Sequence, residues 1–386
     1  MTTPLAAPLR LPAGLVLPNR LAKAALSEGL ATPEGTPSPR LLTLFHRFGR
    51  GGAGLLITGN VMVTPDGLGE PGNVLSRKDP QAWRAWAAAA QAEGTPCFVQ
   101  VNHAGRQVPR SLNAHPAGPS AVPVAIAGMF AMPRALEEAE IVTIVQAFAD
   151  MAAHTKVSGF AGVQIHGAHG YLVSQFLSPL ANLRTDRWGG SLENRMRFAL
   201  ETYRAIRSAV GPTFPVSMKL NASDFRHGGF TVEEAVVVGR TLAQEGLDLL
   251  EVSGGTYEQP AMATSPREVY FLEFARRIRP EVSCPIMLTG GLRSPATMEA
   301  VLQEGVADVI GLGRPIAAEP DFPREVLAGR RPPPRVPVAK GQAGVASDMA
   351  FYQQQLVRMS EGKEPDLEAS RLWAMAKGAV RMLGLG

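Results

Sequence analysis

Cysteine is scarce in this chain of 386 residues, which contains only Cys97 and Cys284. Neither belongs to a Cys-x-x-Cys pair, so thiolates can build neither an iron–sulfur site nor a structural zinc site. Two isolated thiols are typical of a reducing compartment. No apolar run approaches the ~18 residues that a membrane helix needs, and prolines interrupt the N-terminus where a signal peptide would be apolar. We therefore expect a soluble, cytoplasmic protein without a membrane partner.

A strong excess of one charge is also absent, because the formal net charge is only +4 at pH 7. Long basic runs are missing, and so are arginines interleaved with aromatic residues, which argues against a nucleic-acid partner. The small positive excess suits an anionic small molecule. Hydrophobic residues make up 45% of the chain, which is enough for a large core.

Eight short apolar runs are present, and amphipathic stretches or long connections separate them. The runs span residues 20–26, 53–63, 95–102, 160–167, 215–221, 247–254, 284–291 and 307–313. Runs that are apolar throughout are typical of parallel strands covered by helices. Several of the stretches between them end in glycine, a common helix stop, and Thr231 followed by Glu234 predicts a capping box.

Eight such units predict an α/β fold, a (β/α)8 TIM barrel. The competing architecture is a doubly wound sheet, but that fold usually has fewer units and a glycine-rich first turn, which this chain lacks. We expect the barrel to span residues 1–330. Residues 103–135 form a long Pro/Gly-rich connection and would be a lid, and residues 331–386 would be a helical tail on the barrel or a neighbouring subunit.

Chemistry in such barrels occurs at the carboxyl ends of the strands. The seventh run ends in Gly290 and Gly291, and the eighth ends in Gly313 and Arg314. Backbone amides freed by glycines, with an arginine beside them, form a suitable phosphate site in these two loops. The alternative is that the glycines only make tight turns.

The fourth run ends with His166, one residue before its last glycine, and His169 and Tyr171 follow it. A zinc site would need a third and a fourth ligand, and acidic residues are scarce at the strand ends. Either histidine alone could simply belong to the core. The third possibility is that both imidazoles donate hydrogen bonds to one substrate oxygen while Tyr171 supplies a proton.

The stretch IHGAHGYLVSQFLSPLANLRTDRWGGSLENR closely resembles the signature of the Old Yellow Enzyme family of FMN-dependent ene-reductases. Shorter matches cover most of the barrel: LPNRLAKAALSEG, GLLITGNVMV, VQVNHAGRQ, PVSMKLNASDFRHGGF, LTGGLRS and GLGRP. The resemblance implies non-covalent FMN, a hydride donor that is NADH or NADPH, and an activated alkene as substrate.

The resemblance also implies roles for individual residues. His166 and His169 would hold the carbonyl or nitro oxygen of the alkene, and Tyr171 would protonate its α-carbon. Lys219 replaces the arginine that the family commonly has near flavin N1. The implied flavin contacts are Ala24, Ala25, Leu26, Ser27, Asn60, Gln100 and Lys219, and the implied phosphate contacts are Gly290, Gly291, Gly313 and Arg314.

Three other readings remain open from the sequence. Larger relatives with an iron–sulfur cluster are disfavoured because this chain has no cysteine cluster. A flavin-free barrel lyase or aldolase could use Lys219 to form a Schiff base, but the two histidines and the tyrosine would then have no role. A non-catalytic binding protein is a third class. Relatives form dimers and tetramers, so we expect a homo-oligomer.

Overall fold

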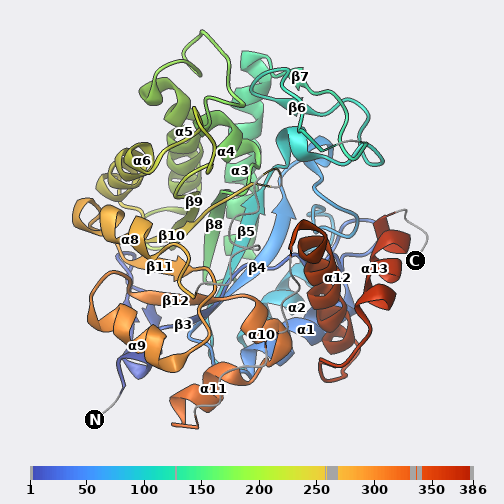
Figure 1. Cartoon of the computed structure of the whole chain (residues 1–386), viewed down its shortest axis with the longest axis vertical. Coiled ribbons are helices and arrows are strands. Elements are labelled where there is room, and N and C mark those ends of the chain that lie inside the picture. Colours follow the sequence, from blue (N-terminus) through green and yellow to red (C-terminus); the bar gives the residue numbers. More distant parts are fainter. Residues whose placement is uncertain are drawn as a thin grey trace.

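Eight parallel strands close into a barrel in this computed structural model, which describes residues 3–126, 128–256, 258, 268–330, 336 and 341–382 (Figure 1). Their order around the barrel is β10-β11-β12-β3-β4-β5-β8-β9. The predicted TIM barrel is confirmed, and each apolar run contains one barrel strand. The strands are β3 (Leu21–Lys23), β4 (Leu55–Met62), β5 (Cys97–Asn102), β8 (Gly162–Gly167), β9 (Val216–Asn221), β10 (Leu249–Ser253), β11 (Ile286–Thr289) and β12 (Val309–Leu312).

Helices surround the barrel and connect its strands (Figure 1). They are α1 (Pro39–Gly49), α2 (Pro80–Gln91), α3 (Glu138–Val157), α4 (Leu172–Leu177), α5 (Leu192–Val210), α6 (Val232–Gln244), α8 (Leu272–Ile278), α9 (Pro295–Gln303), α10 (Arg314–Ala318) and α11 (Phe322–Leu327). The capping box predicted at Thr231 is confirmed, because the Thr231 hydroxyl and the Glu234 carboxylate each accept a hydrogen bond from the other residue's backbone N–H at the start of α6.

The core has two parts because successive side chains of a strand point to opposite faces. One cluster fills the barrel interior and includes Leu55, Ile57 and Phe98. A larger cluster lies between the strands and the helices. In that outer cluster the rings of Phe45 and Trp86 meet edge to face with 5.3 Å between their centroids, which fixes α1 against α2.

The minor elements lie at the ends of the barrel and in its long connections. Strands β1 (Leu9–Arg10) and β2 (Val16–Leu17) pair antiparallel before the first barrel strand. Strands β6 (Ala117–Gly118) and β7 (Arg134–Ala135) pair in the connection that follows β5, drawn in teal in Figure 1. The short 3-10 helices are η1 (Pro4–Ala6), η2 (Pro65–Gly67), η3 (Gly105–Gln107) and η4 (Arg279–Glu281).

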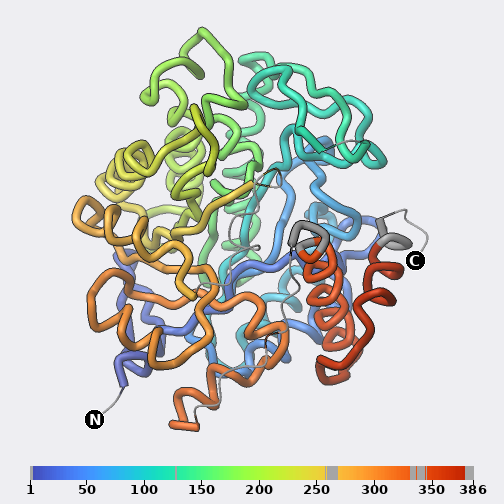
Figure 2. The backbone as a smooth tube through the Cα atoms, in the orientation of Figure 1, coloured from blue at the N-terminus to red at the C-terminus, as the bar shows by residue number. Residues whose placement is uncertain are grey.

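Two further helices follow the barrel, α12 (Gly341–Ser360) and α13 (Arg371–Met382). Helix α12 packs against α1 and α10, and Figure 2 shows this red segment near the blue segment that contains α1. Ion pairs join the partners, because Arg40 of α1 bonds Glu361 at 2.9 Å and Arg314 of α10 lies 3.5 Å from Asp348. Of residues 331–340, the structure describes only Val336. The domain boundary at residue 330 stays a prediction.

None of the described helices is both long enough and apolar enough to cross a bilayer.

Candidate active site

The histidines and the tyrosine of the fourth strand lie together at the carboxyl end of β8. The His166 ring is 5.1 Å from the His169 ring and 4.8 Å from the Tyr171 ring, measured between centroids. His169 has a φ of 60°, a left-handed conformation that non-glycine residues seldom adopt. Its N–H donates to Asn221 Oδ1 at 3.0 Å, which helps to hold this backbone. Such strain is typical of functional sites.

Hydrogen bonds and burial determine the protonation of the two imidazoles. The Ala168 N–H donates to His166 Nδ1 at 3.2 Å, so a neutral His166 has its hydrogen on Nε2. His169 Nε2 lies 2.9 Å from Ser253 Oγ at the end of β10. Burial lowers the pKa of His166 well below its usual range, and burial with the nearby Lys219 lowers the pKa of His169 to about 3. Both rings are therefore neutral hydrogen-bonding groups at pH 7.

Metal binding gains no support from these histidines. Among the residues that the structure describes, no three histidine, cysteine or acidic side chains gather as a metal site requires.

Asn60 and Asn102 connect Tyr171 to the neighbouring strands. The Asn60 amide Nδ2 donates to Tyr171 Oη at 3.4 Å, and Asn102 Nδ2 donates to Asn60 Oδ1 at 3.1 Å. The Tyr171 ring packs in a small apolar cluster with Met62, Ala104 and Val108. Asn60, expected as a flavin contact, thus also contacts the expected proton donor.

A chain of polar side chains crosses the upper interior of the barrel. Gln100 Nε2 donates to Gln164 Oε1 at 2.7 Å, and Gln164 Nε2 donates to Glu251 Oε2 at 2.9 Å. The other oxygen of Glu251 accepts from Thr289 Oγ1 at 2.7 Å and lies 3.0 Å from Lys219 Nζ. Two expected flavin contacts, Gln100 and Lys219, therefore have protein partners, and the Lys219 ammonium has a counter-ion within the barrel.

The residues after β3 lie between β12 and β4. The Ala24 N–H donates to Leu312 O at 3.0 Å, and the Leu26 carbonyl is so close to Gly59 that a Cβ at Gly59 would lie 2.2 Å from it. Within the part of the chain that the structure describes, the buried Ser27 Oγ has no hydrogen-bond partner. A buried hydroxyl without a partner is unfavourable, so a ligand with a polar atom would stabilise this position.

The loops after β11 and β12 contain the expected phosphate contacts. Gly290 and Gly291 have φ values of 135° and 82°, which permit a backbone that other residues would strain. Gly313 immediately precedes α10, whose first residue is Arg314. The Arg314 side chain is about one-quarter exposed and lies 3.5 Å from Asp348, so α12 contributes an acidic residue to this loop.

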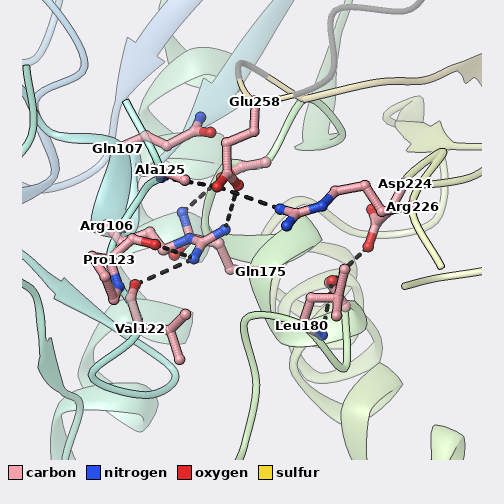
Figure 3. A network of polar contacts seen from close by, with 12 residues as sticks. Arg106, Gln107, Val122, Pro123, Ala125, Gln175, Leu180, Asp224, Arg226 and Glu258 are labelled. Carbon is pink, nitrogen blue, oxygen red and sulfur yellow. Dashed lines mark hydrogen bonds and ion pairs between the residues drawn. The ribbon is translucent and has the colours of Figure 1, made fainter. Parts of the chain in front are cut away.

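An ion cluster with a buried centre, Arg106 and Glu258, joins the loops after β5, β9 and β10 (Figure 3). The Arg106 guanidinium donates to Val122 O at 3.2 Å, to Pro123 O at 3.1 Å and to Glu258 Oε2 at 3.1 Å. Glu258 Oε1 accepts from the Ala125 N–H at 2.9 Å and lies 3.4 Å from Arg226. The cluster attaches the connection after β5 to the loop after β10.

An ion pair that was not predicted from the sequence lies beside the first two barrel strands. Lys23 and Glu28 are buried, with 3.4 Å between Lys23 Nζ and Glu28 Oε1. Lys23 Nζ also donates to Ile57 O at 2.8 Å, and the Gly59 N–H lies 2.9 and 3.0 Å from the two oxygens of Glu28. A lysine inside an otherwise apolar run was the available signal, because such a residue needs a buried partner.

Comparison with known proteins gives a consistent result. Residues 4–332 match the model of the NADH:flavin oxidoreductase / NADH oxidase family. An NADH-dependent flavin oxidoreductase of Hypocrea jecorina is 36% identical over 360 residues, which cover 83% of this chain and 88% of that protein. An NADH oxidase of Thermoanaerobacter brockii is also 36% identical, over 327 residues, 82% of this chain but only 50% of that longer protein.

Solved structures agree with this assignment. The old yellow enzyme homologue from Zymomonas mobilis superposes with a TM-score of 0.73 at 26% identity, over 88% of this chain and 98% of that one. The match of the family model covers most of the chain, and the described barrel has polar residues at the carboxyl ends of its strands. The chain belongs to the NADH:flavin oxidoreductase / NADH oxidase family, the Old Yellow Enzyme group, whose cofactor is FMN and whose hydride donor is a nicotinamide.

Proposed function

We propose that this protein reduces the carbon–carbon double bond of an activated alkene, an α,β-unsaturated carbonyl or nitro compound, using NADH or NADPH. The main support is the cluster of His166, His169 and Tyr171, in which two neutral imidazoles lie beside a phenol. FMN, when bound, would supply the chemistry that accepts hydride from the nicotinamide and delivers it to the β-carbon.

Several buried groups fit that cofactor. Ser27 Oγ is a buried hydroxyl that a polar flavin atom could satisfy, and Gly290 and Gly291 form a tight turn where a phosphate would bind. The full set that would hold FMN is Ala24, Ala25, Leu26, Ser27, Asn60, Gln100, Lys219, Gly290, Gly291, Gly313 and Arg314.

The histidines would act on the substrate oxygen. His166 has its hydrogen on Nε2 when neutral, so it can donate to a carbonyl or nitro oxygen, and His169 lies beside it. A donor aimed at developing negative charge contributes about 2.7–4 kcal/mol to the transition state in well-studied enzymes. Withdrawal of electron density toward this oxygen makes the β-carbon electrophilic.

Tyr171 would complete the reaction as general acid. Its hydroxyl would transfer a proton to the α-carbon as the β-carbon receives hydride, and the resulting phenolate would take a proton back from solvent. The alternative function, a flavin-free lyase that uses Lys219, is disfavoured because the Lys219 ammonium is buried and lies 3.0 Å from Glu251.

The deciding experiment is an anaerobic titration of the purified protein followed in the visible spectrum. Addition of NADPH should bleach the flavin bands, and addition of cyclohexenone should restore them. A protein that stays colourless after incubation with FMN would overturn the proposal. Cytoplasmic location, homo-oligomerisation and a lid formed by residues 103–135 remain predictions.

A further inference from the structure

Strand β4 has one extra residue relative to β5, next to the candidate site. Ile57 pairs with Phe98, but the next registered pair is Asn60 with Gln100, so three steps along β4 match two along β5. Such a bulge reverses the alternation of side chains. Leu55 and Ile57 point into the barrel, and a regular strand would continue that face with Gly59. The bulge instead turns Asn60 inward.

Buried polar groups hold this bulge in place. The Gly59 N–H donates to the Glu28 carboxylate, and Lys23 Nζ bonds both Glu28 and the carbonyl of Ile57. Thr58 Oγ1 accepts from the Gln100 N–H at 2.9 Å and donates to the Gly59 carbonyl at 2.8 Å. The Ile57 and Gly59 carbonyls, the Gly59 N–H and the Thr58 hydroxyl therefore all have partners, which stabilises a buried bulge.

The inward-facing Asn60 lies between two hydrogen-bonding partners, Asn102 and Tyr171. Asn102 Nδ2 donates to Asn60 Oδ1 at 3.1 Å, so the oxygen of Asn60 is oriented toward β5. The amide nitrogen is then directed at Tyr171 Oη, 3.4 Å away. In this orientation Asn60 donates to the phenol oxygen.

We propose that Asn60 is a positioning residue for the proton donor Tyr171, held in the donating orientation by Asn102 and by the bulge that Glu28 anchors. This inference rests on the proposed function, in which Tyr171 protonates the α-carbon. A hydrogen bond donated to the phenol oxygen strengthens as that oxygen becomes negative. Asn60 would therefore stabilise the phenolate that forms when Tyr171 gives up its proton. It would also hold the phenol in position for proton transfer to the α-carbon.

The contact itself can be tested without turnover by fluorine NMR. The chain has five tyrosines, and fluorine placed beside each hydroxyl would give a signal for each. Loss of one signal in Tyr171→Phe assigns Tyr171. Asn60→Ala should shift this signal in the oxidised enzyme, whereas Asn113→Ala should leave it in place. Asn113 is a matched control, because its amide also donates at 3.4 Å, to Asp66 O, outside the site. A Tyr171 signal that Asn60→Ala does not move would overturn the contact.

The catalytic role is tested by a double-mutant cycle on alkene reduction, measured in a single turnover of pre-reduced enzyme. Asn60→Ala should slow this step about tenfold, as expected for one lost hydrogen bond. In a Tyr171→Phe background, Asn60→Ala should change the rate less than about twofold, since the group it serves is gone. Any effect of Asn60→Ala on the cofactor occurs with and without the Tyr171 hydroxyl, so it cancels when the two rate changes are compared. Equal losses in the two backgrounds would overturn the positioning role.

The direction of the hydrogen bond is tested by Asn60→Asp and by the pH profile. A carboxylate cannot donate and would repel the phenolate, so Asn60→Asp should be slower than Asn60→Ala and should move the alkaline limb of the profile to higher pH. A fast Asn60→Asp enzyme would mean that residue 60 accepts from the phenol. If Tyr171→Phe itself reduces alkenes at the normal rate, the proposed proton donor is wrong, whereas the NMR result on the contact is unaffected.

Discussion

Lys219 and Glu251 are register partners on the adjacent strands β9 and β10, and their side chains form an ion pair of 3.0 Å in the barrel interior. Both side chains are at least 97% buried. Glu251 also accepts hydrogen bonds from Gln164 and Thr289, so this carboxylate links its own strand β10 to β8, β9 and β11. The pair therefore contributes to the stability of the barrel and neutralises the charge of Lys219 at the site.

Glu251→Gln should strongly destabilise the protein, because it leaves the Lys219 ammonium buried without its counter-ion. Removal of one partner of a buried pair typically costs about 3–5 kcal/mol in the free energy of unfolding. Urea denaturation measures this loss. The control is Glu281→Gln, which breaks the exposed pair with Arg240 and should have little effect. A loss as small as that of the control would show that Lys219 is stable without Glu251.

Tyr171→Phe should slow alkene reduction by at least about a hundredfold while NADPH oxidation continues nearly as fast as before. Loss of a general acid typically has an effect of this size on the step that needs the proton. Stopped-flow absorbance separates the two half-reactions. Equal losses in both half-reactions would contradict the role of Tyr171 as proton donor.

The free energy of unfolding should fall as the pH is lowered from about 6.5 toward about 3. In this range His169 is neutral in the folded state but protonated in the unfolded chain. Burial lowers the folded pKa of His169 to about 3, whereas an unfolded histidine titrates near 6.5. Between these values the unfolded chain binds more protons, so each pH unit of acidification costs up to about 1.4 kcal/mol. Urea denaturation at about pH 5.5 and about pH 4.5 should show a smaller pH dependence in His169→Asn than in the wild type. Identical dependences would mean that His169 titrates normally.

Ser27→Ala should separate folding from cofactor chemistry. The Ser27 hydroxyl has no partner among the described residues, so its removal should not reduce the stability of the flavin-free protein. If the hydroxyl donates to bound flavin, its loss should shift the two-electron potential by on the order of 20 mV, the equivalent of one hydrogen bond of about 1 kcal/mol. Redox titration against a reference dye measures the potential. An unchanged potential would remove Ser27 from the flavin contacts.

Glu258→Gln should loosen the connection that follows β5, because Arg106, Arg226 and the Ala125 N–H share this carboxylate (Figure 3). Hydrogen exchange of residues 122–126 should become faster, since the segment loses its buried attachment. Glu138→Gln is the control, because it breaks the exposed pair with Arg187. Unchanged exchange in Glu258→Gln would mean that the arginine contacts to Val122 and Pro123 are sufficient.

The sequence by itself determined the barrel, and it predicted which residues of the candidate site lie together. Strands buried on both faces must be apolar throughout, so eight apolar runs were readable without any contact information. His166, His169 and Tyr171 lie within six consecutive residues at the end of β8, and their proximity follows from this spacing alone. The glycines at the ends of the last two strands could be predicted for the same local reason.

Only the tertiary structure decided which polar groups face one another. The inward orientation of Asn60 depends on one extra residue in β4. Glu28, which holds this bulge by accepting from the Gly59 N–H, lies 31 residues from Gly59 in the sequence. The pairing of Lys219 with Glu251 depends on strand register, and Gln100 meets Gln164 across 64 residues. Periodicity describes each strand separately, whereas these contacts depend on how two strands align, and that alignment is set by the packing of the whole barrel.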